Sequence, residues 1–193
     1  MAQFNGYRPV PHETYDQYRN ATIGNGYNVD YYAGNQCWDY CALLWWQYGL
    51  DLRTRVGGNG GAADCWILSK NYNARTPFIA VDGVTNIKRG DIIVTNRNRW
   101  STTGHICIAD EDFRTSGDQM RIWTIGQAPA SHGINGVVSR DQVNLGYFLG
   151  IFRNTRWQGS PTPPSPVVYN KGKYNFVLFN RRKRQERNGQ GNI

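Results

Sequence analysis

The stretch Cys37-Trp-Asp-Tyr-Cys-Ala-Leu-Leu-Trp-Trp-Gln-Tyr48 carries apolar side chains on nearly every side of a helix. A helix of this kind is predicted to be buried, and Gly49 is predicted to end it. A glycine-rich turn at 57–61 separates it from a second short helix expected within 62–72, and a further short helix is predicted around 12–20.

The pattern of residue types changes after Gly90. Runs of β-branched and aromatic residues, divided by turn residues, predict strands at 91–95, 104–109, 121–125 and 146–153. Helices followed by consecutive strands indicate an α+β domain, with N-terminal helices packed on a C-terminal antiparallel β-sheet. A length of 193 residues suits one such domain with tails.

The C-terminal part has a different composition from the body of the chain. We predict a domain over 1–157, a stiff Pro-rich linker over 158–166 and a basic tail over 167–193. The net charge is +8, and residues 171–193 alone hold seven basic residues and one acidic residue. Such a tail suits nucleic acid, an anionic cell-wall polymer or a membrane surface equally well, and a solvated tail without a partner is the alternative.

Two further classes are disfavoured by the sequence. No apolar run approaches the roughly 20 residues of a membrane-spanning helix. Residues 1–11 are polar, so no signal peptide is predicted. A disulfide framework is therefore not expected, although one disulfide among Cys41, Cys65 and Cys107 is left open. Zinc-ligand spacing is missing around the cysteines.

Cys37 and His105 are the candidate reactive pair. Cys37 opens the buried helix, where the positive end of the helix dipole favours a thiolate. His105 begins a predicted strand whose alternation puts His105, Cys107 and Ala109 on one face. An imidazole there could accept the thiol proton. The alternatives are that Cys37 is a small buried apolar residue and that His105 is structural.

Several motifs resemble those of CHAP domains, the cysteine, histidine-dependent amidohydrolases and peptidases, and especially those of phage endolysins of Gram-positive hosts. The opening motif is Tyr27-Asn-Val-Asp-Tyr-Tyr-Ala-Gly-Asn-Gln-Cys-Trp-Asp39. It is followed, in the order of the family, by Lys88-Arg-Gly-Asp-Ile-Ile-Val94, Gly104-His-Ile-Cys-Ile108, Trp123-Thr-Ile-Gly-Gln127 and Leu145-Gly-Tyr-Phe-Leu-Gly-Ile-Phe152. The resemblance covers roughly residues 10–155.

The resemblance implies a papain-like fold with Cys37 as nucleophile and His105 as general base. Gln36 would lie near the oxyanion, unless it only bonds the preceding loop. The family usually places a Glu or Asn on the next strand to orient the imidazole. This sequence departs from that pattern with Gly126 and Ala128, which leaves Gln127 as the predicted orienting residue, unless its side chain faces away.

The same resemblance implies a calcium site just before the nucleophile, and no organic cofactor. The family pattern maps onto Asn28, Asp30, Tyr32, Gly34 and Asp39. Side-chain and backbone oxygens at such positions suit a hard cation. The alternative is that Asp39 caps the helix or bonds the loop and that Asp30 makes a turn.

The implied function is peptidoglycan hydrolysis through Cys37, either as an N-acetylmuramoyl-L-alanine amidase or as an endopeptidase. Bacterial peptidoglycan would be the substrate, and the basic tail would bind an anionic wall polymer, phage DNA or the virion. The protein would act from the host cytoplasm on the wall after release, or as a virion component. The alternative is a catalytically idle virion protein that binds nucleic acid through its tail.

Overall fold

The computed structural model describes residues 11–29, 35–49, 61–69, 77–98, 101–127 and 136–157. All of them belong to the first of two compact units, Met1–Pro161. The helices are α1 (Tyr15–Thr22), α2 (Cys37–Gln47) and α3 (Ala62–Ser69), with short 3-10 helices η2 (Val84–Asn86) and η3 (Leu145–Tyr147). The strands are β1 (Phe78–Val81), β2 (Ile92–Thr95), β3 (His105–Ala109), β4 (Arg121–Gly126), β5 (Ser139–Asn144) and β6 (Phe148–Asn154).

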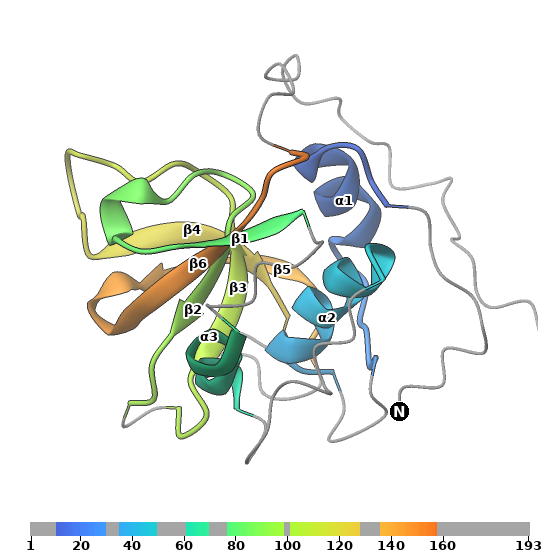
Figure 1. Ribbon diagram of the computed structural model, residues 1–193, viewed down its shortest axis with the longest axis horizontal. Coiled ribbons are helices and arrows are strands. Elements are labelled where there is room, and N and C mark those ends of the chain that lie inside the picture. Colours follow the sequence, from blue (N-terminus) through green and yellow to red (C-terminus); the bar gives the residue numbers. More distant parts are fainter. Residues whose placement is uncertain are drawn as a thin grey trace, which may run out of the picture. The chain divides into compact units, whose positions relative to one another are not determined.

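The described strands form one antiparallel sheet of six strands in the order β1-β6-β2-β3-β4-β5 (Figure 1). Strand β3 lies inside the sheet, with Ile92 of β2 opposite Ile108 and Ile125 of β4 opposite the same residue. The α+β class with an antiparallel sheet is thereby confirmed. The central place of β3 bears on the predicted site because the strand begins with His105.

The two faces of the sheet carry separate apolar clusters. Ile106 and Ile108 belong to the cluster that also contains Leu44 and Trp45 of α2. Cys107 and Ala109, the alternate residues of β3, belong to the cluster on the other face. Alternation along a strand therefore decides which β3 residues meet α2.

Helix α2 confirms the buried helix expected from the sequence. It begins at Cys37 and ends at Gln47, and Gly49 adopts a φ of 75° just beyond it. The backbone N–H groups of Tyr48 and Gly49 donate to the carbonyls of Trp45 and Trp46. Because this helix has almost no polar face, its packing against β3 and the rest of the sheet decides where Cys37 lies.

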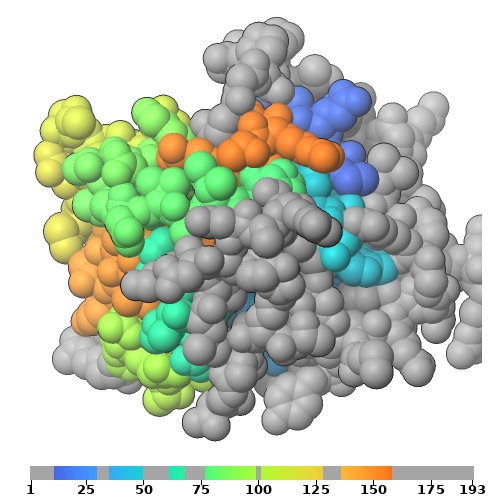
Figure 2. All heavy atoms as spheres, viewed as in Figure 1, coloured from blue at the N-terminus to red at the C-terminus, as the bar shows by residue number. Residues whose placement is uncertain are grey.

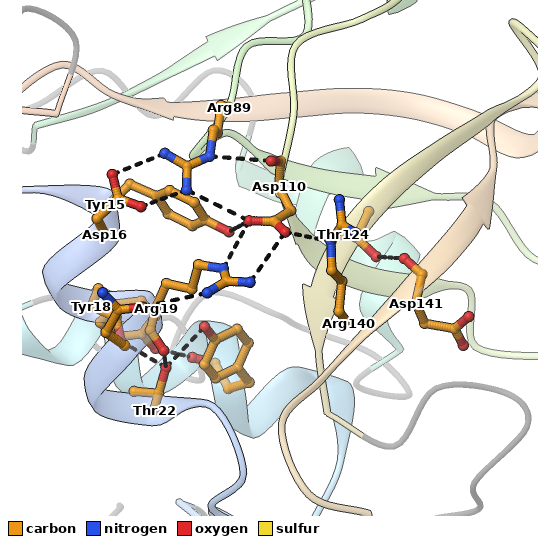
Figure 3. Close-up of polar contacts among 12 residues, drawn as sticks. Tyr15, Asp16, Tyr18, Arg19, Thr22, Arg89, Asp110, Thr124, Arg140 and Asp141 are labelled. Atoms are coloured by element: carbon orange, nitrogen blue, oxygen red, sulfur yellow. Dashed lines mark hydrogen bonds and ion pairs between the residues drawn. The ribbon is translucent and has the colours of Figure 1, made fainter. Parts of the chain in front are cut away.

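Helix α1 joins the sheet through a polar cluster around Asp110, the residue that follows β3 (Figure 3). The Asp110 carboxylate accepts hydrogen bonds from Tyr15 Oη and Arg19 Nε, both at 2.9 Å, and from Arg140 Nε at 2.6 Å. Arg89 lies 3.8 Å away. Only 6% of the Asp110 side chain is exposed, so these donors take the place of water.

The chain beyond β6 also returns to α1. Trp157 packs on Tyr15 and Tyr18, with ring centroids 5.8 Å from each. In the space-filling view, the end of β6 (orange) runs across the surface between the green residues of β1 and the blue residues of α1 (Figure 2). The contact between β6 and β1 follows from their antiparallel pairing in the sheet.

The structure adds two strands that the sequence does not predict. Strand β5 reads Ser-Arg-Asp-Gln-Val-Asn and is half exposed, so it lacks the apolar residues that mark a strand. Strand β1 has only four residues. Both lie at the edges of the sheet, where a strand buries less apolar surface.

The predicted Pro-rich linker and basic tail lie outside the described residues. All four cysteines are described and are free thiols. The disulfide left open by the sequence is therefore not formed. Within the described segments, no helix is both long and apolar enough to cross a membrane.

Replacing Asp110 should destabilise the fold because three donors would lose a largely buried acceptor. We expect Asp110→Asn to lower the free energy of unfolding by about 2 kcal/mol. Asp82, whose residue is exposed, offers a matched control, and Asp82→Asn should change stability by less than about 0.5 kcal/mol. Urea unfolding followed by tryptophan fluorescence measures both; equal effects would show that the cluster adds no stability.

Candidate functional site

Cys37 is the first residue of α2 and the one cysteine that solvent reaches. Its side chain is partly exposed, whereas Cys41, Cys65 and Cys107 are buried. Gln36 is the N-cap residue of the helix. The first backbone N–H groups of a helix have no partner within it, and the helix dipole places partial positive charge there. Cys37 therefore lies where a thiolate and an oxyanion are both favoured.

His105 lies beside Cys37, and each of the two side chains shifts the pKa of the other. His105 is the first residue of β3 and is partly exposed. Helix α2 and strand β3 are in direct contact, which brings the two residues together from distant parts of the chain. The structure thus places the two predicted catalytic residues side by side.

The turn into β3 depends on Gly104. This glycine has a φ of 78°, a conformation that other residues rarely adopt. A Cβ atom at this position would lie 2.5 Å from the carbonyl oxygen of Thr95 and 2.9 Å from Cβ of Ala63. The close approach of α3 and β2 to this backbone therefore requires glycine directly before His105.

The pair is biased towards a thiolate and an imidazolium. Burial alone raises the pKa of the Cys37 thiol, but the His105 imidazole and backbone hydrogen bonds bring it below its usual value. Burial alone lowers the pKa of His105, but Cys37 and a hydrogen bond with Cys107 raise it well above its usual value. Opposite charges on neighbouring groups stabilise each other, so the arrangement favours transfer of the thiol proton to the imidazole.

Asp39 organises the loop that precedes Cys37. Its carboxylate is fully buried and accepts hydrogen bonds from the backbone N–H of Val29 at 2.6 Å and of Gln36 at 2.8 Å. The second contact is that of a capping box, in which a residue in the first turn bonds the N-cap backbone. These contacts are the capping and loop-bonding alternative that the sequence left open.

Gln127 joins both ends of the same loop to the sheet. Its side chain is fully buried; Oε1 accepts from the Tyr27 N–H at 2.6 Å, and Nε2 donates to the carbonyls of Tyr27 at 2.5 Å and Gln36 at 3.0 Å. These contacts correct the expected role. The amide faces the loop before Cys37 rather than the imidazole of His105, because Gln127 continues β4 on the face of the sheet that α2 covers.

The predicted calcium ligands are only partly described. Asn28 and Asp39 lie in the described segments, while Asp30, Tyr32 and Gly34 lie outside them. Asn28 Oδ1 is buried and has no hydrogen-bond partner. Over the described ranges, no group of three or more His, Cys, Asp or Glu side chains could hold a metal ion. Gln36 bonds the loop through its backbone, and a part for it at the oxyanion stays a prediction.

The sequence does not assign Cys107 a role, yet this residue is one of the groups that raise the pKa of His105. The signal for this contact was present in the alternation of β3, which puts residues 105 and 107 on one face. Burial of Cys107, at 0% exposure, keeps the contact away from solvent.

Gln127→Glu should destabilise the fold because the new carboxylate would face the carbonyls of Tyr27 and Gln36. We expect a loss of about 3 kcal/mol in the free energy of unfolding. The same change at the exposed Gln142 of β5 is the matched control and should cost less than about 0.5 kcal/mol. Thermal unfolding compares the two. Wild-type stability in Gln127→Glu would instead favour an amide that faces His105.

Comparison with known proteins gives a fold relative. No protein-family model matches the chain, and no curated protein matches it either. Among solved structures, the chain is similar to the crystal structure of the wild-type endolysin LysIME-EF1, with a TM-score of 0.53 and 19% sequence identity. The match covers 72% of this chain and 62% of that one. At this identity the likeness establishes a shared fold, and the chain spans less than two thirds of the endolysin it matches.

Proposed function

We propose that this protein is a peptidoglycan hydrolase that cleaves an amide bond through Cys37. The observation that carries the proposal is that Cys37, the first residue of α2, lies beside His105, the first residue of β3. The likeness in fold to a solved endolysin supports the proposal of a peptidoglycan hydrolase. The CHAP-like motifs quoted above support a cysteine mechanism in particular.

In the proposed reaction each group has its own step. The Cys37 thiolate attacks the amide carbon, and the carbonyl oxygen becomes an oxyanion near the first N–H groups of α2. The intermediate collapses, the carbon–nitrogen bond breaks, and His105 gives its proton to the leaving amine. Water then attacks the thioester while His105 takes a proton from it, which releases the acid and restores the thiolate.

The bond cleaved is either N-acetylmuramoyl–L-alanine or a peptide bond of the stem or cross-bridge. Both are amides and place the same demands on Cys37 and His105. The residues that would distinguish them contact the substrate on either side of the amide. We propose the Gram-positive wall as the place of action, reached after release from the host cytoplasm or from a virion.

We propose in addition that a calcium ion is bound in the loop before Cys37. The described part of the loop fits such an ion, because the buried Asn28 Oδ1 lacks any hydrogen-bond partner and an unsatisfied buried oxygen is costly. Asp39 would add a carboxylate oxygen, beside the backbone contacts it already makes. When bound, the ion would hold the loop in place before the nucleophile.

Wall hydrolysis tests the proposed activity. Wild type should release soluble fragments from purified Gram-positive peptidoglycan, and Cys37→Ala should reduce the rate by about a thousandfold or more. Cys65→Ala, which removes a buried thiol from α3, is the matched control and should stay active. Labelling the new amino termini identifies the bond, since L-alanine indicates an amidase and a bridge residue an endopeptidase. A folded wild type that releases nothing from walls of several chemotypes contradicts the proposal.

Thermal unfolding tests the calcium ion. Calcium at about 1 mM should raise the midpoint of wild type relative to the chelator EDTA, because a ligand that binds only the folded state stabilises it. Asn28→Asp adds a negative charge and should enlarge the shift, whereas Asn28→Ala should diminish it. Equal midpoints with and without calcium in both wild type and Asn28→Asp would rule the site out.

A further inference from the structure

The His105 ring lies between two thiols. The ring interacts with Cys37, from α2, and with Cys107, two residues further along the same face of β3, and both raise its pKa. The imidazolium form of histidine donates from both ring nitrogens, so it can bond two acceptors at once. Sulfur is a weak acceptor, and here it is fully buried, with 0% of Cys107 exposed. Water therefore does not compete for the contact at Cys107.

Gly126 leaves the space that this arrangement needs. A Cβ atom at Gly126 would lie 3.2 Å from Cβ of Cys107 and 3.9 Å from Nε2 of His105. The register of β4 against β3, with Ile125 opposite Ile108, brings Gly126 next to Cys107 on the same face. Any larger residue would displace the Cys107 side chain from this position, so the neighbouring strand supplies room instead of a polar group.

Gln127 is not available for the same task, since Tyr27 and Gln36 occupy its amide group. We propose that Cys107 is the positioning residue of the site: its sulfur accepts the ring N–H that does not face Cys37 and holds the imidazole against the nucleophile. This inference rests on the proposed cysteine mechanism and names the group that orients its base. The raised pKa of His105 agrees with it, because an added acceptor favours the protonated ring.

Three variants test this role without any need for the substrate. Cys107→Ala removes the acceptor, Cys107→Ser replaces it with an oxygen, and Cys65→Ala removes a buried thiol from α3 as a control. NMR titration of the His105 ring reports its pKa. The pH profile of alkylation by iodoacetamide, with the modified peptide identified by mass spectrometry, reports the reactivity of Cys37.

In Cys107→Ala, the pKa of His105 should fall and alkylation of Cys37 near pH 6.5 should slow about tenfold, as expected for a shift of about one pH unit in the pair. Cys107→Ser should stay within about threefold of wild type, and Cys65→Ala should match wild type. A Cys107→Ala variant whose His105 titration and Cys37 rate both stay within about twofold of wild type overturns the proposal. If Cys107→Ala fails to fold, Gly126→Ala, which crowds Cys107, must give the same direction of change or the proposal fails.

A His105→Gln variant separates this inference from the proposed function. If His105→Gln leaves the alkylation profile of Cys37 unchanged, the reactive pair itself is absent, and both proposals fall. If His105→Gln slows alkylation but Cys107→Ala does not, only the role of Cys107 is overturned. Slowing by both variants, together with rescue by Cys107→Ser, supports the role.

Discussion

The packing of α2 on β3 is the constraint on which the site depends. Helix α2 has hardly any polar side, so its place on the sheet is set by burial against residues such as Ile106 and Ile108. That burial brings the first residue of the helix, Cys37, to the first residue of the strand, His105. A displacement of α2 along β3 would separate Cys37 from His105, because each residue lies at the end of its element.

Buried polar groups then fix the loop that leads into α2. Asp39 and Gln127 are both fully buried. The Asp39 carboxylate accepts hydrogen bonds from backbone N–H groups of this loop, and the Gln127 amide bonds backbone groups at both ends of it. Burying such groups is costly unless their partners are in place, so displacement of the described ends of this loop, at Tyr27, Val29 and Gln36, is penalised. The same contacts hold the start of α2, where the proposed mechanism requires oriented N–H groups.

The sequence predicts the parts of this structure that follow from burial and periodicity, and misses those that follow from tertiary contacts. The apolar stretch of α2 and the interior strands were predictable because each buries a continuous apolar set. Strand β5 was missed because an edge strand needs no such set. The contacts of Gln127 could not be foreseen, since its partners are backbone groups of a distant loop and backbone groups carry no signal in the sequence. The pairing of Cys37 with His105 was predicted from the helix start, the strand alternation and the CHAP-like motifs together.

A thiol as third member of the site changes its electrostatics. A carboxylate beside an imidazolium would add a second negative charge and stabilise the protonated ring strongly, at the cost of burying that charge. Cys107 offers a sulfur acceptor in place of that carboxylate, so the protonated ring receives less support from behind. The positive end of α2 supports the other half of the pair, the thiolate of Cys37, which is the first residue of the helix. The position of the nucleophile on the helix and the identity of the residue behind the base are therefore two parts of one electrostatic arrangement.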